Sequence, residues 1–311
     1  MKDNYKKWIK NLLMVIILIV SIYFLVEKLV SNWNEVQAYD WEISYFYFLI
    51  SLVGLIIYYL VAHAFQWRPI LSTLGVKLTF YKSLKYWTIG QLGRYLPGKV
   101  WFVLGRLYFC SKEGIRKSIV LLSIFLELFF LAITSIFIFL VSLLFAKQVQ
   151  LNTNYIYALI VIIFLAFIFI HPKVFSKIIN FILKKIKKPL LKIEITKFQI
   201  LKFSLLISFL WFFQGFLFFI FSKSIYSQLG WSFLPLFIGA YALAWFLGLI
   251  SFVTPGGIGV REVILTYFLG NYLPSYIIVV IVILFRLILT AIEFGLGAIL
   301  SMHHKFGKKN C

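Results

Sequence analysis

Long apolar runs with almost no charge recur along this chain, and they restrict its fold more than any other feature. A helix of about 20 apolar residues crosses the hydrocarbon core of a bilayer. Such runs occupy residues 12–30, 44–67, 118–146, 153–171, 200–221, 233–253 and 275–300. Charged residues are only 13% of the chain, against about a quarter in soluble proteins. The sequence therefore predicts an all-α, polytopic integral membrane protein whose single transmembrane domain covers residues 1–311.

Two further stretches, residues 83–110 and 255–273, contain Pro-Gly breaks in apolar sequence. The first break is Pro97-Gly98, and the second is Pro255-Gly256-Gly257. Proline removes a backbone donor and glycine weakens a helix, so both places predict broken or re-entrant helices. Irregular backbone at membrane depth is tolerated only inside protein or beside a cavity. Paired breaks in two halves of a chain therefore point to a transport site.

The positive charge of the chain is concentrated in a few segments. Lysines precede the first run, fill a basic loop at about residues 173–198 and end the tail, whereas Glu35, Asp40 and Glu42 follow the first run. The positive-inside rule then places both termini and the basic loop in the cytoplasm. If 83–110 is re-entrant and 255–273 crosses as a short broken span, about eight crossings result. The loop has either an amphipathic helix on the anionic leaflet or charge that only sets topology.

The spacing of the two breaks suggests an internal duplication. Pro97 and Pro255 are 158 residues apart, Glu127 follows Pro97 by 30 residues, and Arg286 follows Pro255 by 31. We therefore expect two repeats, at about residues 75–172 and 230–300.

The second break combines glycines with an arginine. Pro255 suits the first turn of a helix. The backbone at Gly256, Gly257 and Gly259 would let an anionic group approach the positive end of the following half-helix. Arg261 would bind phosphate oxygens with its planar guanidinium, and Glu262 would either orient Arg261 or switch its own protonation. The alternative is that the glycines serve helix packing while Arg261 reaches the interface.

The first break is flanked by cations. Arg94, Lys99 and Arg106 lie around Pro97-Gly98. In a re-entrant segment they would form a basic lining for a head group. They would serve equally as interfacial anchors, together with neighbouring aromatic residues.

Further charges lie within the apolar runs, and each needs a partner. An unpaired charge at the bilayer centre costs at least several kcal/mol. Arg286 and Glu293 are seven residues apart in the last run, on one helical face. With Glu127 and Glu262 they form a predicted intramembrane charge network, in which we expect Glu127 to pair with Arg286. This network would either take part in transport or act only as structural glue.

A metal-dependent membrane glycosyltransferase and direct coupling to ATP are both disfavoured by what the sequence lacks. Cys110 and Cys311 fit no metal or redox spacing, Asp3 and Asp40 form no Asp-x-Asp pair, and no P-loop is present. We therefore expect no metal and no cofactor. We also expect membrane lipids, and no nucleic acid, as partners.

These motifs resemble the membrane domain of bacterial lysylphosphatidylglycerol synthases and its stand-alone, flippase-like relatives. The resemblance spans residues 10–300 and rests on Leu96-Pro97-Gly98 with Arg106, an acidic residue in the next run (Glu127), Pro255 to Glu262, and an arginine in the last run (Arg286). The second motif is the more specific. Many relatives have a second glycine where this chain has Lys99, which points to a subgroup with a different head group.

The resemblance implies a function in the bacterial plasma membrane. It implies translocation of an anionic lipid or a polyprenyl-phosphate-linked glycan in cell-envelope biogenesis. Some relatives resemble parts of polysaccharide pathways. The soluble aminoacyl-transferase domain does not follow the last run, so we expect no lysyl transfer and no enzymatic activity. The alternatives are a non-transporting accessory subunit that docks an envelope-synthesis enzyme, and an integral enzyme with Glu127 or Glu262 as base.

Overall fold

The computed structural model describes residues 33–96, 100–149, 195–251 and 254–306, with isolated positions between 23 and 31 and between 152 and 161. All regular structure in these ranges is helical. Helices long and apolar enough to cross a membrane are Tyr45–Thr73, Lys117–Phe145, Lys197–Ile225, Trp231–Ile250 and Ser275–Met302. The prediction of an all-α, polytopic membrane protein is confirmed. Nearly all of the expected spans at 12–30 and 153–171 and most of the basic loop lie outside the described residues, so the number of crossings stays a prediction.

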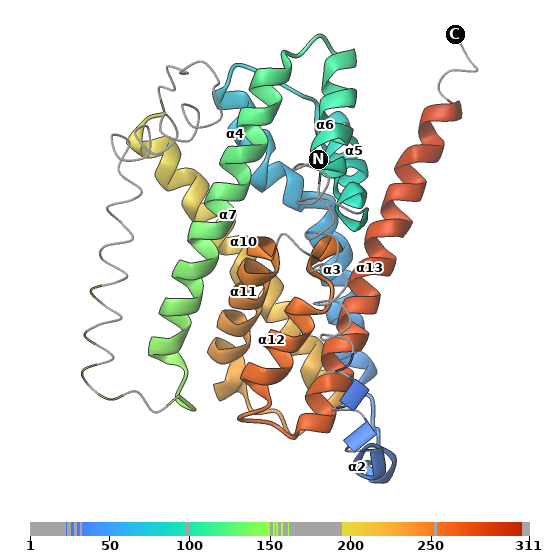
Figure 1. Cartoon of the computed structure of the whole chain (residues 1–311), viewed down its shortest axis with the longest axis vertical. Helices are drawn as coiled ribbons and strands as arrows, with labels where there is room; N and C mark the ends of the chain where they lie inside the picture. Colours follow the sequence, from blue (N-terminus) through green and yellow to red (C-terminus); the bar gives the residue numbers. More distant parts are fainter. Residues whose placement is uncertain are drawn as a thin grey trace, which may run out of the picture.

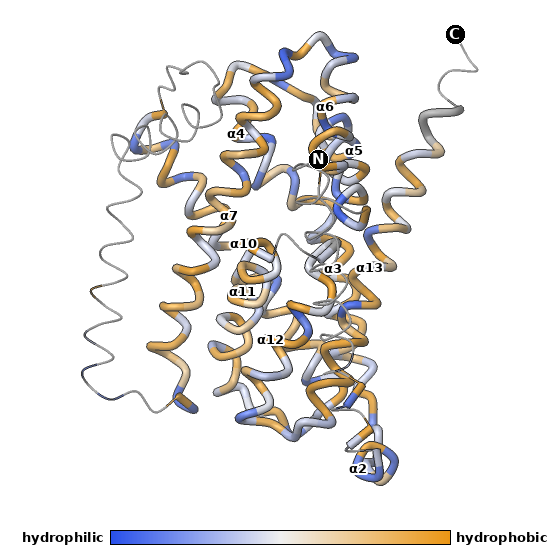
Figure 2. The backbone as a smooth tube through the Cα atoms, in the orientation of Figure 1, coloured by the Kyte–Doolittle hydropathy of each residue, from blue (hydrophilic) through white to orange (hydrophobic). Residues whose placement is uncertain are grey.

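Four long helices form the frame of the bundle. They are α3 (Tyr45–Gln66), α7 (Lys117–Phe145), α10 (Lys197–Ile225) and α13 (Ser275–Phe306). Apolar residues continue through each of them, as Figure 2 shows. Helix α10 begins at a capping box in which Thr196 and Gln199 bond each other's backbone amides. It packs against α3, α7 and α11, so it lies at the centre of the fold.

Two helical hairpins carry the predicted breaks. The first consists of α5 (Phe80–Leu92), the 3-10 turn η1 (Gly93–Tyr95) and α6 (Trp101–Lys112). The second consists of α11 (Leu234–Ile250), the 3-10 turn η3 (Pro255–Gly257) and α12 (Val260–Leu269). In each hairpin the second helix packs against the first. Pro97, Gly98 and Lys99 lie outside the described residues.

The tips of the two hairpins meet inside the bundle. Figure 1 shows α5 and α6 in the upper half and α11 and α12 in the lower half, whereas α7 and α13 extend through both. The turns η1 and η3 are in contact. Helix α12 has only 10 residues, about half of what a crossing needs. Residues 255–273 therefore form the second arm of a hairpin, and the separate short span that we expected there is not found.

Shorter elements close the two ends of the bundle. They are α2 (Trp33–Ala38), α4 (Arg68–Thr73) and η2 (Trp231–Phe233). The apolar core is rich in aromatic rings, and Phe218 contacts Phe237, Tyr241 and Phe285. Each aromatic side chain buries a large apolar area against its neighbours, and aromatic rings pack in preferred geometries. These contacts fix α10, α11 and α13 against one another below the hairpin tips.

Candidate functional site

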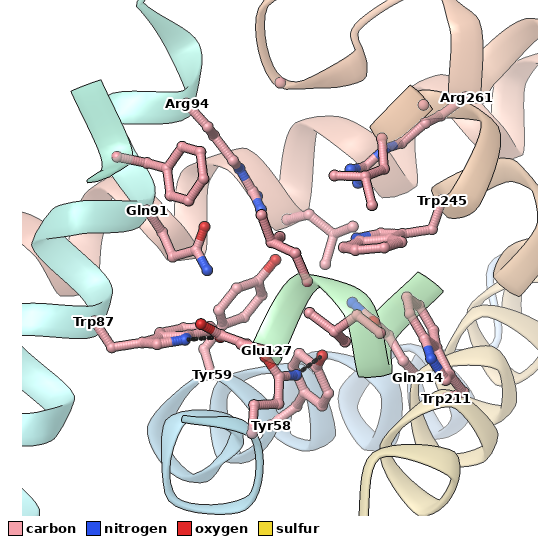
Figure 3. A pocket seen from close by; sticks show the side chains of 18 of the residues that line it. Tyr58, Tyr59, Trp87, Gln91, Arg94, Glu127, Trp211, Gln214, Trp245 and Arg261 are labelled. Atoms are coloured by element: carbon pink, nitrogen blue, oxygen red, sulfur yellow. Dashed lines mark hydrogen bonds between the residues drawn. The ribbon is translucent and has the colours of Figure 1, made fainter. Parts of the chain in front are cut away.

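A cavity of about 90 Å³ lies where the hairpin tips meet. Four arginines line it, namely Arg94, Arg106, Arg261 and Arg286. Figure 3 shows how aromatic and amide side chains surround the same space, among them Tyr58, Tyr59, Trp87, Gln91, Trp211, Gln214 and Trp245. The fold thus brings Arg94 and Arg106 of the first break and Arg261 of the second into one cavity, together with the predicted arginine of the last span. Lys99 lies outside the described residues.

Arg106 and Glu127 form a closed pair at one side of the cavity. Both side chains are almost fully buried, with 1% and 0% exposed, and the guanidinium forms an ion pair with the carboxylate. The indole of Trp87 donates a further hydrogen bond to Glu127, 2.8 Å long. The guanidinium of Arg106 also lies over the rings of Trp67 and Trp87, at 4.8 and 5.8 Å. Glu127 is therefore held by donors on both oxygens.

Arg94 and Glu293 connect the tip of the first hairpin to α13. Their side chains form an ion pair, and Glu293 also accepts hydrogen bonds from the hydroxyls of Tyr59 and Tyr95. These donors come from α3 and η1. A buried carboxylate needs such partners, because its desolvation is otherwise costly. The contact fixes η1 against both helices.

Arg286 and Glu262 hold the tip of the second hairpin. Arg286 donates to the carbonyl oxygen of Gly256 at 3.0 Å, and its Nε lies 3.2 Å from Glu262 Oε1. Glu262 in turn accepts the Gly259 amide at 2.6 Å, as a carboxylate at the start of α12. The expected pairing of Glu127 with Arg286 is wrong, because each has a nearer partner. Glu262 likewise pairs with Arg286 and not with Arg261, and it occupies the Gly259 amide that we expected an anionic ligand to approach.

Arg261 has no carboxylate partner among the described residues. Its guanidinium lies over Trp245, 5.4 Å from the ring centre, and its Nε is buried without a hydrogen-bond partner. Glycine makes room for its stem, since a Cβ on Gly248 would lie 2.6 Å from Arg261 Cγ. Gly257 has a φ of 73°, and a Cβ there would lie 2.9 Å from Arg261 Nε. Gly248 and Gly257 therefore allow the side chain of Arg261 to lie close to the backbone of the second hairpin.

The charges around the cavity do not cancel. Four arginines line it, and three carboxylates, Glu127, Glu262 and Glu293, pair with Arg106, Arg286 and Arg94. One positive charge is left over in the described part of the site, and it belongs to Arg261. An anion is the ligand that would balance it.

Sequence reasoning missed one recurring arrangement. Trp87 precedes Gly90 by three residues, as Trp245 precedes Gly248, and each pair is separated from its counterpart by 158 residues, the spacing of Pro97 and Pro255. A Cβ on Gly90 would lie 2.7 Å from Arg106 Cγ. Each hairpin thus places an arginine over a glycine and beside a tryptophan. The Trp-x-x-Gly pattern at this spacing was the available signal.

The two arrangements differ in the partner of the arginine. The residue 158 positions after Glu127 is Phe285, on α13. Phe285 lines a small cavity of about 20 Å³ with Trp245, Arg261 and Arg286. The first hairpin therefore supplies its arginine with a carboxylate, whereas the second has an aromatic ring at the corresponding sequence position.

An all-helical bundle with two broken hairpins and a charged internal cavity defines a class of integral membrane proteins with a polar site between spans. The family model described as the lysylphosphatidylglycerol synthase TM region matches residues 11–297, so the chain belongs to this family. The resemblance to this family is thereby confirmed, and the family is one of membrane domains linked to lipid handling. Among curated proteins and solved structures, nothing matches the chain significantly.

Proposed function

We propose that the chain is a flippase-like translocator of an anionic lipid or lipid-linked glycan, and that Arg261 is the receptor for the head-group anion. The observation that carries this proposal is the difference between two similar arginine sites. Arg106 and Arg261 both lie over a glycine and beside a tryptophan, but only Arg106 has a carboxylate partner among the described residues.

The ligand would lie beside Arg261 in the way that Glu127 lies beside Arg106. Two oxygens of a phosphate can accept from the planar fork of a guanidinium, and these bonds are charge-assisted. The surrounding aromatic and amide groups, including Trp211, Gln214 and Trp245, would contact the rest of the head group. A cavity of about 90 Å³ is below the few hundred Å³ of sites that enclose whole ligands. The acyl chains would therefore remain in the bilayer.

The meeting of the two tips supplies a mechanism for alternating access. The pair Arg94–Glu293 ties one hairpin to α13, and Arg286 ties the other through Gly256 and Glu262. Because the hairpins occupy opposite halves of the bundle (Figure 1), release of one pair would expose the cavity toward one end. An anion bound at Arg261 would compete with Glu262 and Glu293 for the nearby arginines, and it would so favour release of one of these ion pairs. No covalent change of the lipid is part of this proposal.

The charges at the two ends indicate the orientation. Cations lie near the ends of α4, α6 and α7 and the start of α10, at Arg68, Lys77, Lys112, Arg116, Lys117 and Lys197. In the described part of the chain, the other end has the acidic residues Glu35, Asp40 and Glu42 and only two lysines, Lys147 and Lys223, after α7 and in the last turn of α10. The positive-inside rule then places the α5–α6 end in the cytoplasm of a bacterial cell, with the α11–α12 hairpin entering from outside. Both termini would then be cytoplasmic.

Proteoliposomes that contain only the purified chain test the proposal. The measurement is the rate at which fluorescent phosphatidylglycerol becomes accessible to a membrane-impermeant quencher, with the zwitterionic phosphatidylcholine, which has no net charge, as the comparison. We expect Arg261→Gln to slow movement of the anionic probe roughly tenfold or more, since a charged hydrogen bond of about 1.5–3 kcal/mol is lost. Arg261→Lys should retain part of the rate.

Arg116→Gln is the matched control, because it removes an exposed arginine far from the cavity. A folded Arg261→Gln protein that moves the probe as fast as wild type would overturn the proposed receptor. If the chain alone is inactive and supports movement only with an envelope-synthesis enzyme, the accessory-subunit function replaces translocation.

A further inference from the structure

A second polar cavity lies away from the hairpin tips, at the end of the bundle near α4. It has a volume of about 360 Å³ and is formed by the end of α3, α4, the turn that follows α4, and α10. We call it the α4 groove. Its lining includes three exposed cations, Arg68, Lys77 and Lys202, with Ser72 beside them. None of the residues of the central cavity takes part in it.

The charge of the α4 groove is not neutralised within the described chain. No acidic side chain lines the groove, and none forms an ion pair with Arg68, Lys77 or Lys202 among the described residues. Arg68 is held in place because its Nε donates to the carbonyl oxygen of Leu78 at 3.2 Å. Three like charges around one cavity repel one another, and a bound anion would relieve that repulsion.

An apolar stripe on α10 begins beside the α4 groove. Phe198, Leu201, Leu205, Phe209 and Phe212 are all exposed, with 74% for Phe198 and 62% for Leu205. Their spacing of three and four residues places them on one face of the helix. Lys202 lies next to this face, one turn after Phe198. The groove and the stripe together offer cations for a head group and an apolar surface for acyl chains.

We propose that the α4 groove binds the phosphate of an anionic phospholipid whose acyl chains lie along the exposed face of α10. This lipid is a resident ligand, separate from the head group in the central cavity, and the assignment does not rest on the proposed translocation. A lipid is favoured over a soluble phosphate because the cations adjoin a lipid-facing apolar stripe. Cations near the membrane surface attract anionic lipids in this way.

The test titrates the detergent-purified full chain with short-chain phosphatidylglycerol and follows the thermal unfolding midpoint. Lys77→Gln with Lys202→Gln removes two groove cations that make no described hydrogen bond. We expect this double variant to need roughly tenfold more lipid, or still more, for half of the wild-type stabilisation. Addition of Arg68→Gln should weaken binding further, although it also removes the contact to Leu78.

Lys112→Gln with Lys117→Gln is the matched control, since both are exposed lysines outside the groove. Retention of wild-type lipid response in this control, and its loss in the groove variant, supports the site. Equal weakening in both double variants would show a diffuse charge effect and overturn it. Equal stabilisation by short-chain phosphatidylcholine, or by glycerol phosphate alone, would also overturn the assignment to an anionic lipid.

Discussion

Arg286 and Glu293 lie seven residues apart on one face of α13, and each contacts the tip of a different hairpin. Arg286 reaches η3 and the start of α12, whereas Glu293 reaches η1. Two turns of one helix thus hold both breaks at their meeting point. A shift or tilt of α13 would therefore act on both hairpins at once.

The buried pair Arg106–Glu127 should be far more important for stability than a surface pair. Glu127→Gln leaves an unpaired, buried guanidinium, so we expect a loss of roughly 3–5 kcal/mol in the free energy of unfolding. The exposed pair Lys82–Glu113 is the comparison, and Lys82→Gln should cost less than about 1 kcal/mol. Thermal unfolding of the variants in one detergent measures both.

Charge exchange distinguishes the observed partner of Glu127 from the one expected from the sequence. Arg106→Glu combined with Glu127→Arg should recover part of the stability lost in either single variant. Glu127→Arg combined with Arg286→Glu should recover nothing, because these two residues have separate partners. Recovery only in the second combination would contradict the described pairing.

The contacts of Glu293 predict a graded effect at the first hairpin. Tyr95→Phe removes one hydrogen bond of 2.7 Å to the carboxylate of Glu293 and should cost about 1.5–3 kcal/mol. Arg94→Gln removes the ion pair and should cost more, because the carboxylate then stays buried without its cation. Tyr45→Phe alters an exposed tyrosine and should leave the unfolding midpoint unchanged. Equal effects of all three would argue against a specific contact at Glu293.

Gly248→Ala should displace Arg261 without unfolding the protein. The added methyl group would lie 2.6 Å from Arg261 Cγ and 2.7 Å from its Nε, so the whole side chain has to shift. We expect slower movement of the anionic probe and a lower unfolding midpoint, in a protein that still folds. Gly295→Ala is the control, since a Cβ there meets nothing within 4 Å. That change should leave transport intact and stabilise α13 by up to about 1 kcal/mol.

Glu113 predicts a pH dependence at the end of the bundle. Hydrogen bonds from Lys82 and Tyr86 lower the pKa of this carboxyl below its usual value, which is about 4.3. A lowered pKa in the folded state contributes stability above the unfolded pKa, and that contribution is lost as the pH falls through the folded pKa. The advantage of wild type over Glu113→Gln should therefore be present at neutral pH, begin to fall below about pH 4.3, and be lost once the pH is below the lowered pKa of the folded state. High salt should reduce it at neutral pH.

The sequence by itself determined the membrane class and the two breaks. Apolar runs have one low-energy solution in a bilayer, which is a helix with all backbone groups bonded internally. Proline and glycine mark where a continuous helix is interrupted, so the break at Pro255 could be predicted without coordinates. The same-face placement of Arg286 and Glu293 followed from helical periodicity alone.

Only the tertiary structure decided which charges meet. Arg106 and Glu127 lie on separate helices, 21 residues apart, and Arg94 and Glu293 are 199 residues apart. Sequence offsets favoured Glu127 with Arg286, but a buried pair forms only between groups that packing brings within hydrogen-bond distance. The absence of a carboxylate partner for Arg261 among the described residues depends on the same packing, because the residue types alone do not say which carboxylate each arginine reaches.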